Sequence, residues 1–176
     1  RNHYFTLFTK GDSDQGKGAH LKIKDYYISI AGDTPQYTTL DDLKPLIEVV
    51  HHACQAGAYD EVFTAIYWER ISQQDRHVLQ HQLGAYETTL ALLIEFFPNV
   101  DTLQEANVTD NFDKRWILGA VGSCLMSLGR LREAVPFFER KNELYEKTSA
   151  GYRNLAGLHA NLGSLEASTE AAHQAL

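Results

Sequence analysis

Residues 11–18 are the part of the chain whose types and spacing come nearest to a catalytic motif. Gly11, Gly16 and Lys17 follow the Gly-x4-Gly-Lys pattern of a phosphate-binding loop, after the β-prone run at residues 4–8. That motif needs a Ser or Thr after the Lys as a Mg²⁺ ligand, and this chain has Gly18. A nucleotide-binding enzyme fragment that uses the degenerate loop from Gly11 to Gly18 is therefore the alternative interpretation. A linker is the preferred one, because the rest of the chain predicts no α/β sheet.

Histidine pairs have spacings that a metal site uses. His77 and His81 are four residues apart, which places both on one face of a helix, and His51 is followed directly by His52. The Glu of a metalloprotease helix is missing, because Val78 takes its position. No Ser/His/Asp or Cys/His set has a local signature for nucleophilic catalysis. The sequence therefore predicts no metal, no cofactor and no enzyme activity.

Composition and charge restrict the partners. A net charge of −7 in 176 residues disfavours nucleic acid, whose binding rests on clustered Lys and Arg. No stretch approaches the ~20 apolar residues of a membrane span, and no signal peptide is recognisable, so no membrane partner is expected. The two cysteines, Cys54 and Cys124, are too few for a disulfide framework and indicate a reducing compartment. We expect a cytoplasmic chain that is part of a longer protein, since it stops at Leu176 inside an amphipathic pattern.

Apolar side chains recur at helical spacing from residue 19 onward, which predicts a largely helical chain. The expected organisation begins with an irregular N-terminal extension at 1–18 and a leading helix and linker at 19–37. A helical repeat array follows at 38–176, with units at about 38–73, 74–111, 112–148 and 149–176.

Glycines mark the turns between the predicted helices. Gly57, Gly84, Gly129 and Gly163 each stand two residues before a Tyr or Leu, and a Glu follows soon after. Gly129 and Gly163 are 34 residues apart, and Gly57 and Gly129 are 72 apart, which is close to two repeats of ~34–36 residues. This period is typical of a helix–turn–helix solenoid, a fold that displays binding surfaces.

The unit at about 112–148 resembles a tetratricopeptide repeat. Gly122 stands in the glycine position of that repeat, Ala134 in the small-residue position and Phe138 in the aromatic position, whereas Lys141 replaces an expected Ala. The resemblance implies an all-α fold, a right-handed superhelical solenoid of antiparallel helix pairs. In such pairs each small residue lets two helix backbones approach, and each aromatic fills the groove between them.

Longer phrases are similar to the C-terminal repeat region of bacterial, often cyanobacterial, STAND-type signalling ATPases. They include residues 43–57, Tyr67-Trp68-Glu69-Arg70-Ile71, residues 83–87, Phe96-Phe97-Pro98 and Gly129-Arg130-Leu131. The similarity covers about residues 21–176. It implies a repeat sensor that follows an effector and an ATPase domain in the parent protein.

Pattern and resemblance together predict a protein–protein interaction module, the scaffold or sensor arm of a larger signalling protein. It would bind a peptide, a protein or another domain of the parent chain on its concave face. The candidate contact residues lie on the first helices of the pairs, off the apolar stripe: Glu48, His51, His52, Gln55, Arg115, Ser123, Arg153 and Asn154. Trp68 joins them because its neighbour Tyr67 already occupies the stripe. A structural dimerisation arm is a further alternative.

Overall fold

The computed structural model describes residues 13–32, 39–144 and 149–176. All regular elements within these ranges are helices, which confirms the predicted all-α class. The β-prone run at residues 4–8 and Gly11 lie outside the described residues. The contacts divide the chain into two units, Arg1–Ala85 and Tyr86–Leu176, and each is described by itself.

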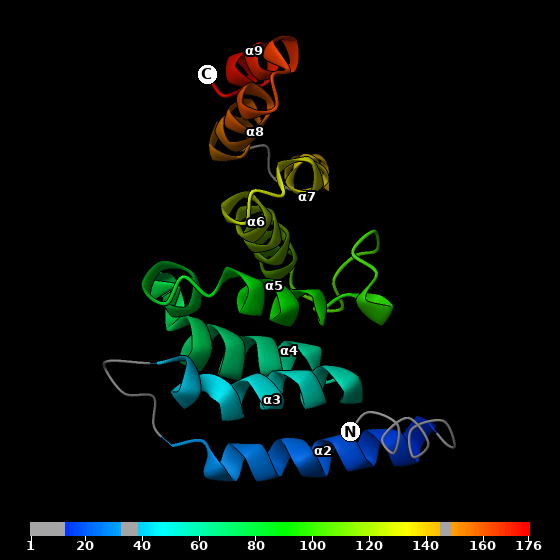
Figure 1. Cartoon of the computed structure of the whole chain (residues 1–176). Helices are drawn as coiled ribbons and strands as arrows, with labels where there is room; N and C mark the ends of the chain where they lie inside the picture. Colours follow the sequence, from blue (N-terminus) through cyan, green and yellow to red (C-terminus); the bar gives the residue numbers. More distant parts are fainter. Residues whose placement is uncertain (1–12, 33–38, 145–148) are drawn as a thin grey trace. The chain divides into compact units, whose positions relative to one another are not determined.

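The first unit is built from helices that pack in succession. α2 packs along α3, and α3 packs against α4 and its continuation η1, as Figure 1 shows for the blue, cyan and green helices. The elements are α2 Ser13–Ile30, α3 Leu40–Ala56, α4 Tyr59–Val62, the π-helix η1 Phe63–Ser72, the 3-10 helix η2 Gln74–Arg76 and the π-helix η3 Val78–Gln82.

Helix α2 begins at Ser13, inside the segment 1–18 for which the sequence predicts an irregular extension. Gly16 and Gly18 are helical, and each glycine costs a helix only about 1 kcal/mol relative to Ala. The packing of α2 on α3 outweighs that cost. Residues 13–18 therefore do not form the loop that a phosphate site requires, and the nucleotide-binding alternative gains no support from them.

Helix α3 begins with a capping box. The Thr39 hydroxyl accepts a hydrogen bond from the Asp42 amide at 3.3 Å, and the Thr39 amide donates to the Asp42 carboxylate at 2.9 Å. These bonds from Thr39, the backbone amide first, lower the pKa of Asp42. The buried stripe of the helix follows from there, with Leu43, Leu46 and Val50 in the core.

The second unit is again a succession of packed helices. Its elements are α5 Tyr86–Ile94, the 3-10 helix η4 Pro98–Val100, α6 Asn111–Ser127, α7 Leu131–Leu144, α8 Ser149–Asn161 and α9 Leu165–Gln174. Each of the α-helices packs on the next one along the chain.

The predicted turn glycines are found at the turns. Gly57, Gly84, Gly129 and Gly163 have φ values of 83°, 60°, 73° and 77°, a conformation that residues with a Cβ rarely adopt. After Gly57, Gly129 and Gly163 the next amide donates to the carbonyl five residues back, at 2.8–2.9 Å, as in a Schellman motif. At Gly84 the bond reaches six residues back, from Ala85 to Leu79 at 2.7 Å, because the preceding helix η3 is a π-helix.

The core of the second unit contains the close approach that the tetratricopeptide pattern implies. A Cβ added at Gly122 would lie 2.8 Å from the Phe138 ring, so α6 and α7 meet through a site that only glycine fits. Lys141, which replaces the expected Ala, lies over a second glycine, Gly119, where an added Cβ would be 2.9 Å from its Nζ. Burial first, and then the Arg115 charge, lower the pKa of Lys141.

The polar segment between η4 and α6, residues 101–110, is an insertion that is attached to the core of this unit. Arg140 of α7 donates to the Thr102 carbonyl and, at 2.8 Å, to the Gln104 carbonyl. The Asn107 amide donates to the Phe96 carbonyl at 2.7 Å. One cationic side chain thus holds the backbone of the insertion at two points.

Candidate functional site

The predicted contact residues divide between the two units. Glu48, His51, His52 and Gln55 lie on α3 and Trp68 on η1 of the first unit. Arg115 and Ser123 lie on α6, and Arg153 and Asn154 on α8, of the second. The predicted set is therefore divided between the two units.

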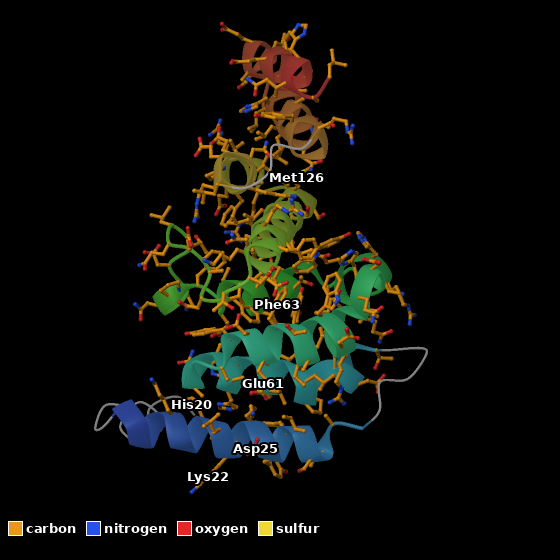
Figure 2. The ribbon with its side chains drawn as sticks, turned by 180° about the vertical axis from the view of Figure 1, so that it is seen from behind. His20, Lys22, Asp25, Glu61, Phe63 and Met126 are labelled. Atoms are coloured by element: carbon orange, nitrogen blue, oxygen red, sulfur yellow. The ribbon has the colours of Figure 1, made fainter. Side chains whose placement is uncertain are left out.

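His52 does not face an open groove. It is 7% exposed, and its Nδ1 lies 2.8 Å from Nδ1 of His20 on α2. Its ring is stacked on Tyr27 and packs edge-on against His51. Figure 2 shows His20 on the side of α2 that is nearest to α3, with Lys22 pointing away. With α2 in this place a partner cannot reach His52, whereas Gln55 is exposed.

The contact between His20 and His52 constrains protonation. Two Nδ1 atoms at hydrogen-bond distance require one N–H donor and one lone pair, so at least one ring is neutral. Burial first, and then the neighbouring His51, lower the pKa of His20. Within the residues that the structure describes, no group of three or more His, Cys, Asp or Glu side chains is arranged to hold a metal ion. The cluster is therefore an internal contact between α2 and α3.

Trp68 also makes an internal contact. Its half-buried ring packs edge-on against His77 at 6.3 Å between ring centroids, and His77 packs against His81 at 5.3 Å. Tyr67 is buried and Trp68 is rotated off the buried stripe, as the sequence predicts. Burial and then the His81 charge lower the pKa of His77.

The second unit contains an open cavity of about 430 Å³ between α7, α8 and α9. Cavities of this size are typical of ligand sites. Each helix presents one face to it, since the lining residues recur at helical spacing. They are Glu139, Asn142 and Glu143 of α7, Tyr152, Leu155 and His159 of α8, and Ala167, Glu170, Ala171 and Gln174 of α9.

The most informative lining residue is Asn142. It is 3% exposed, yet neither its Nδ2 nor its Oδ1 has a hydrogen-bond partner among the residues that the structure describes. An amide buried in this way destabilises a protein by about 1–3 kcal/mol unless something satisfies it. Glycine at position 151 leaves room for this amide, because an added Cβ would collide with Oδ1 of Asn142. Asn142 thus lines the cavity, and its covered amide beside Gly151 has a donor and an acceptor that the described residues do not use.

The side chains that line the cavity include several carboxylates, which give it negative charge. Glu139, Glu143 and Glu170 line it and are exposed, while none of its described lining residues is Lys or Arg. Carboxylates of one sign around a concave site concentrate the field within it and favour a cationic ligand.

The predicted residues of the second unit lie outside this cavity. On α8, Arg153 and Asn154 do not line it, although Tyr152 and Leu155 on either side of them do. The predicted contact residues of this unit all lie on the first helix of a pair, whereas Asn142 lies on α7, the second helix of its pair, and was therefore not predicted. A usable signal was present, since an Asn inside a helix is unfavourable and here stands three residues after one Glu and directly before another.

Comparison with known proteins identifies no relative: no family model, no curated protein and no solved structure matches the chain. None of the helices that the structure describes is long and apolar enough to cross a membrane.

Proposed function

We propose that the chain is a protein–protein interaction module that binds an extended peptide segment in the cavity between α7, α8 and α9. The observation that carries this proposal is the unpartnered amide of Asn142, which lines that cavity. In an extended peptide the N–H and the C=O of one residue point to the same side, which is the complement of an Asn side chain. A bound backbone would therefore satisfy both atoms at once.

The wider setting of the module follows from the sequence pattern. Helix pairs with glycine turns at a 34-residue spacing support a tetratricopeptide-like superhelical array. We propose that the array is the cytoplasmic scaffold or sensor arm of a larger signalling protein. Binding would act by favouring one arrangement of that protein over another, which needs no chemistry in this chain.

The test is selection of peptides from a random phage-displayed library with the full chain as bait. We expect enriched peptides to bind wild-type protein and to lose at least about tenfold in affinity to Asn142→Leu, since a removed amide leaves the peptide group unpaired. Circular dichroism would show that the variant remains helical. The proposal fails if no peptide is enriched over an unrelated bait, or if Asn142→Leu binds every selected peptide as well as wild type does.

Binding on the predicted concave residues would give a different result in the same experiment. Peptides that bind Asn142→Leu normally but lose affinity to Gln55→Ala or Ser123→Ala would place the site on the first helices of the pairs. Both side chains are exposed, so these substitutions leave the core intact.

A second candidate function, dimerisation, is favoured by the apolar surface of α2. Tyr26 is 60% exposed and Ile30 is 50% exposed on this helix. Two copies of the chain that bury these side chains against each other would gain apolar burial. Light scattering across a range of concentrations tests this: a constant monomer mass excludes it, and a mass that doubles and returns to monomer with Tyr26→Ser and Ile30→Ser supports it.

A further inference from the structure

We infer that the cavity between α7, α8 and α9 selects a basic peptide, with an arginine or lysine side chain seated against its carboxylates. This inference rests on the proposed function, because it names the class of segment that the interaction module would bind.

The first argument is the placement of charge around the cavity. Glu139 and Glu143 come from α7, and Glu170 comes from α9, so carboxylates approach the cavity from two of its three walls. A cation between them is attracted by each, and an acidic side chain is repelled by each. None of the described lining residues is Lys or Arg, so neither side chain offsets the preference of the site for a cationic ligand.

The second argument is the match between the remaining lining and a long cationic side chain. Leu155 and Ala171 are buried at the cavity and offer apolar surface for the methylene stem. Tyr152 lines the same cavity, and an aromatic ring attracts a cation that packs on its face. The head group then reaches the exposed carboxylates, where the planar guanidinium of arginine pairs with two oxygens at once.

Asn142 binds the backbone of the peptide and so fixes its position, while the carboxylates select a basic side chain. Its Oδ1 accepts an N–H from the bound backbone, and its Nδ2 donates to a backbone C=O. A free amine lacks that peptide group and would leave one of the two atoms unpaired. The site therefore favours a peptide over a small polyamine of the same charge.

The probe is a capped octapeptide in which arginine alternates with serine, and its matched control has citrulline, the neutral counterpart of arginine, in place of every arginine. Calorimetric titration of the full chain is expected to show the arginine peptide binding at least about tenfold tighter, with the difference shrinking as salt screens the carboxylates. Spermine, which has charge but no peptide group, is expected to bind at least about tenfold more weakly than the arginine peptide.

Variants locate the effect. Glu139→Gln and Glu170→Gln are each expected to weaken the arginine peptide by about threefold to tenfold and to leave the citrulline peptide unchanged. The matched control is Glu166→Gln, which removes an exposed carboxylate from α9 that does not line the cavity. All three residues are on the surface, so the variants are expected to fold.

The outcomes separate the inference from the proposed function. Equal affinity for the arginine and citrulline peptides, or equal loss in Glu166→Gln, overturns the basic preference, while library peptides that depend on Asn142 would still support the module. Spermine binding as tightly as the arginine peptide assigns the cavity to a small amine and overturns the peptide specificity. If neither octapeptide binds and the library selection also fails, both proposals fall.

Discussion

At the scale of single residues, stability and the proposed binding make opposite demands on Asn142. Replacing it by Leu is expected to raise the free energy of unfolding by about 1–2 kcal/mol, because a buried unpaired amide is replaced by an apolar side chain with the same branching. Urea unfolding followed by circular dichroism measures the change. Asn161→Leu, at an exposed position of α8, is the control and is expected to change stability by less than about 0.5 kcal/mol.

A destabilised Asn142→Leu protein would contradict this account. It would show that the amide is satisfied inside the protein and that the cavity has no need of a ligand. Asn161 does not line the cavity, so the stability of the Asn161→Leu control has no bearing on this conclusion.

A second prediction concerns the approach of α6 and α7. Gly122→Ala is expected to destabilise the protein by about 1–3 kcal/mol, because the new Cβ would lie 2.8 Å from the Phe138 ring. Gly157→Ala, in α8, meets nothing within 4 Å and is expected to stabilise by about 0.5–1 kcal/mol. Urea unfolding of both variants checks this, and the same sign for the two changes would refute the packing argument.

Single residues also show what the sequence predicts well. The turn glycines follow from local backbone chemistry, and the close approach of Phe138 to Gly122 is what the resemblance to a tetratricopeptide repeat implies, so both were predictable. The state of Asn142 was not, because it depends on how α8 and α9 pack beside α7. His52 was expected in a groove and is buried under α2, since helical phase cannot say which neighbour covers a face.

At the scale of elements, the sequence predicts that a helix is present more reliably than it predicts the type of the helix or the residues at which it begins and ends. The helix after Gly57 was expected, but its π-helical hydrogen bonding over Phe63–Ser72 was not, because π-helices are rare and the apolar pattern carries no separate signal for them. The start of α2 was predicted about six residues too late, at residue 19 instead of Ser13. Gly16 and Gly18 look like loop residues until the packing of α2 on α3 is known.

The insertion before α6 provides a third prediction. Arg140→Met is expected to free the backbone at residues 101–105, because the hydrogen bonds to the Thr102 and Gln104 carbonyls are lost while much of the aliphatic stem is kept. Hydrogen exchange of those amides is expected to become faster. Arg132→Met, at an exposed position of the same helix, is the control, and equal exchange in the two variants would show that Arg140 does not hold the insertion.

The contact between α2 and α3 provides a fourth prediction, on pH. The pKa of His20 is lowered from its ordinary value of 6.5, so the folded chain binds this proton more weakly than the unfolded chain does. Its contribution to stability is therefore complete above about pH 6.5 and is lost as the pH falls through the lowered pKa. We expect faster amide exchange in α2 at about pH 5.5 than at about pH 7.5, after correction for intrinsic rates.

The charged neighbours of His20 define the controls. His51 and His52 face it from α3, Glu48 lies 3.9 Å from Nε2 of His52, and Lys24 pairs with Glu61 at 3.4 Å between α2 and α4. His20→Leu is expected to remove the pH dependence in α2. Persistence of that dependence in His20→Leu, or its absence in the wild type, would contradict the assignment. Measurement within α2 is needed because His77 has a lowered pKa as well.

At the scale of the whole molecule, apolar periodicity was enough to predict the all-α fold that the described residues adopt. The superhelical stacking of the pairs stays a prediction, because the angle between successive pairs depends on side-chain shape and not on periodicity. The acidic cavity was not predicted for a related reason. It forms where three helices meet, and no single helix of the sequence carries its pattern.

The most direct test of the central claim is a crystal structure of the full chain with a peptide from the library selection. We predict that the peptide lies between α7, α8 and α9, with the N–H and C=O of one residue paired to the Asn142 amide and a basic side chain at the carboxylates. A peptide bound elsewhere, with Asn142 contacting only water or other residues of the chain, would contradict the assignment of this cavity as the binding site.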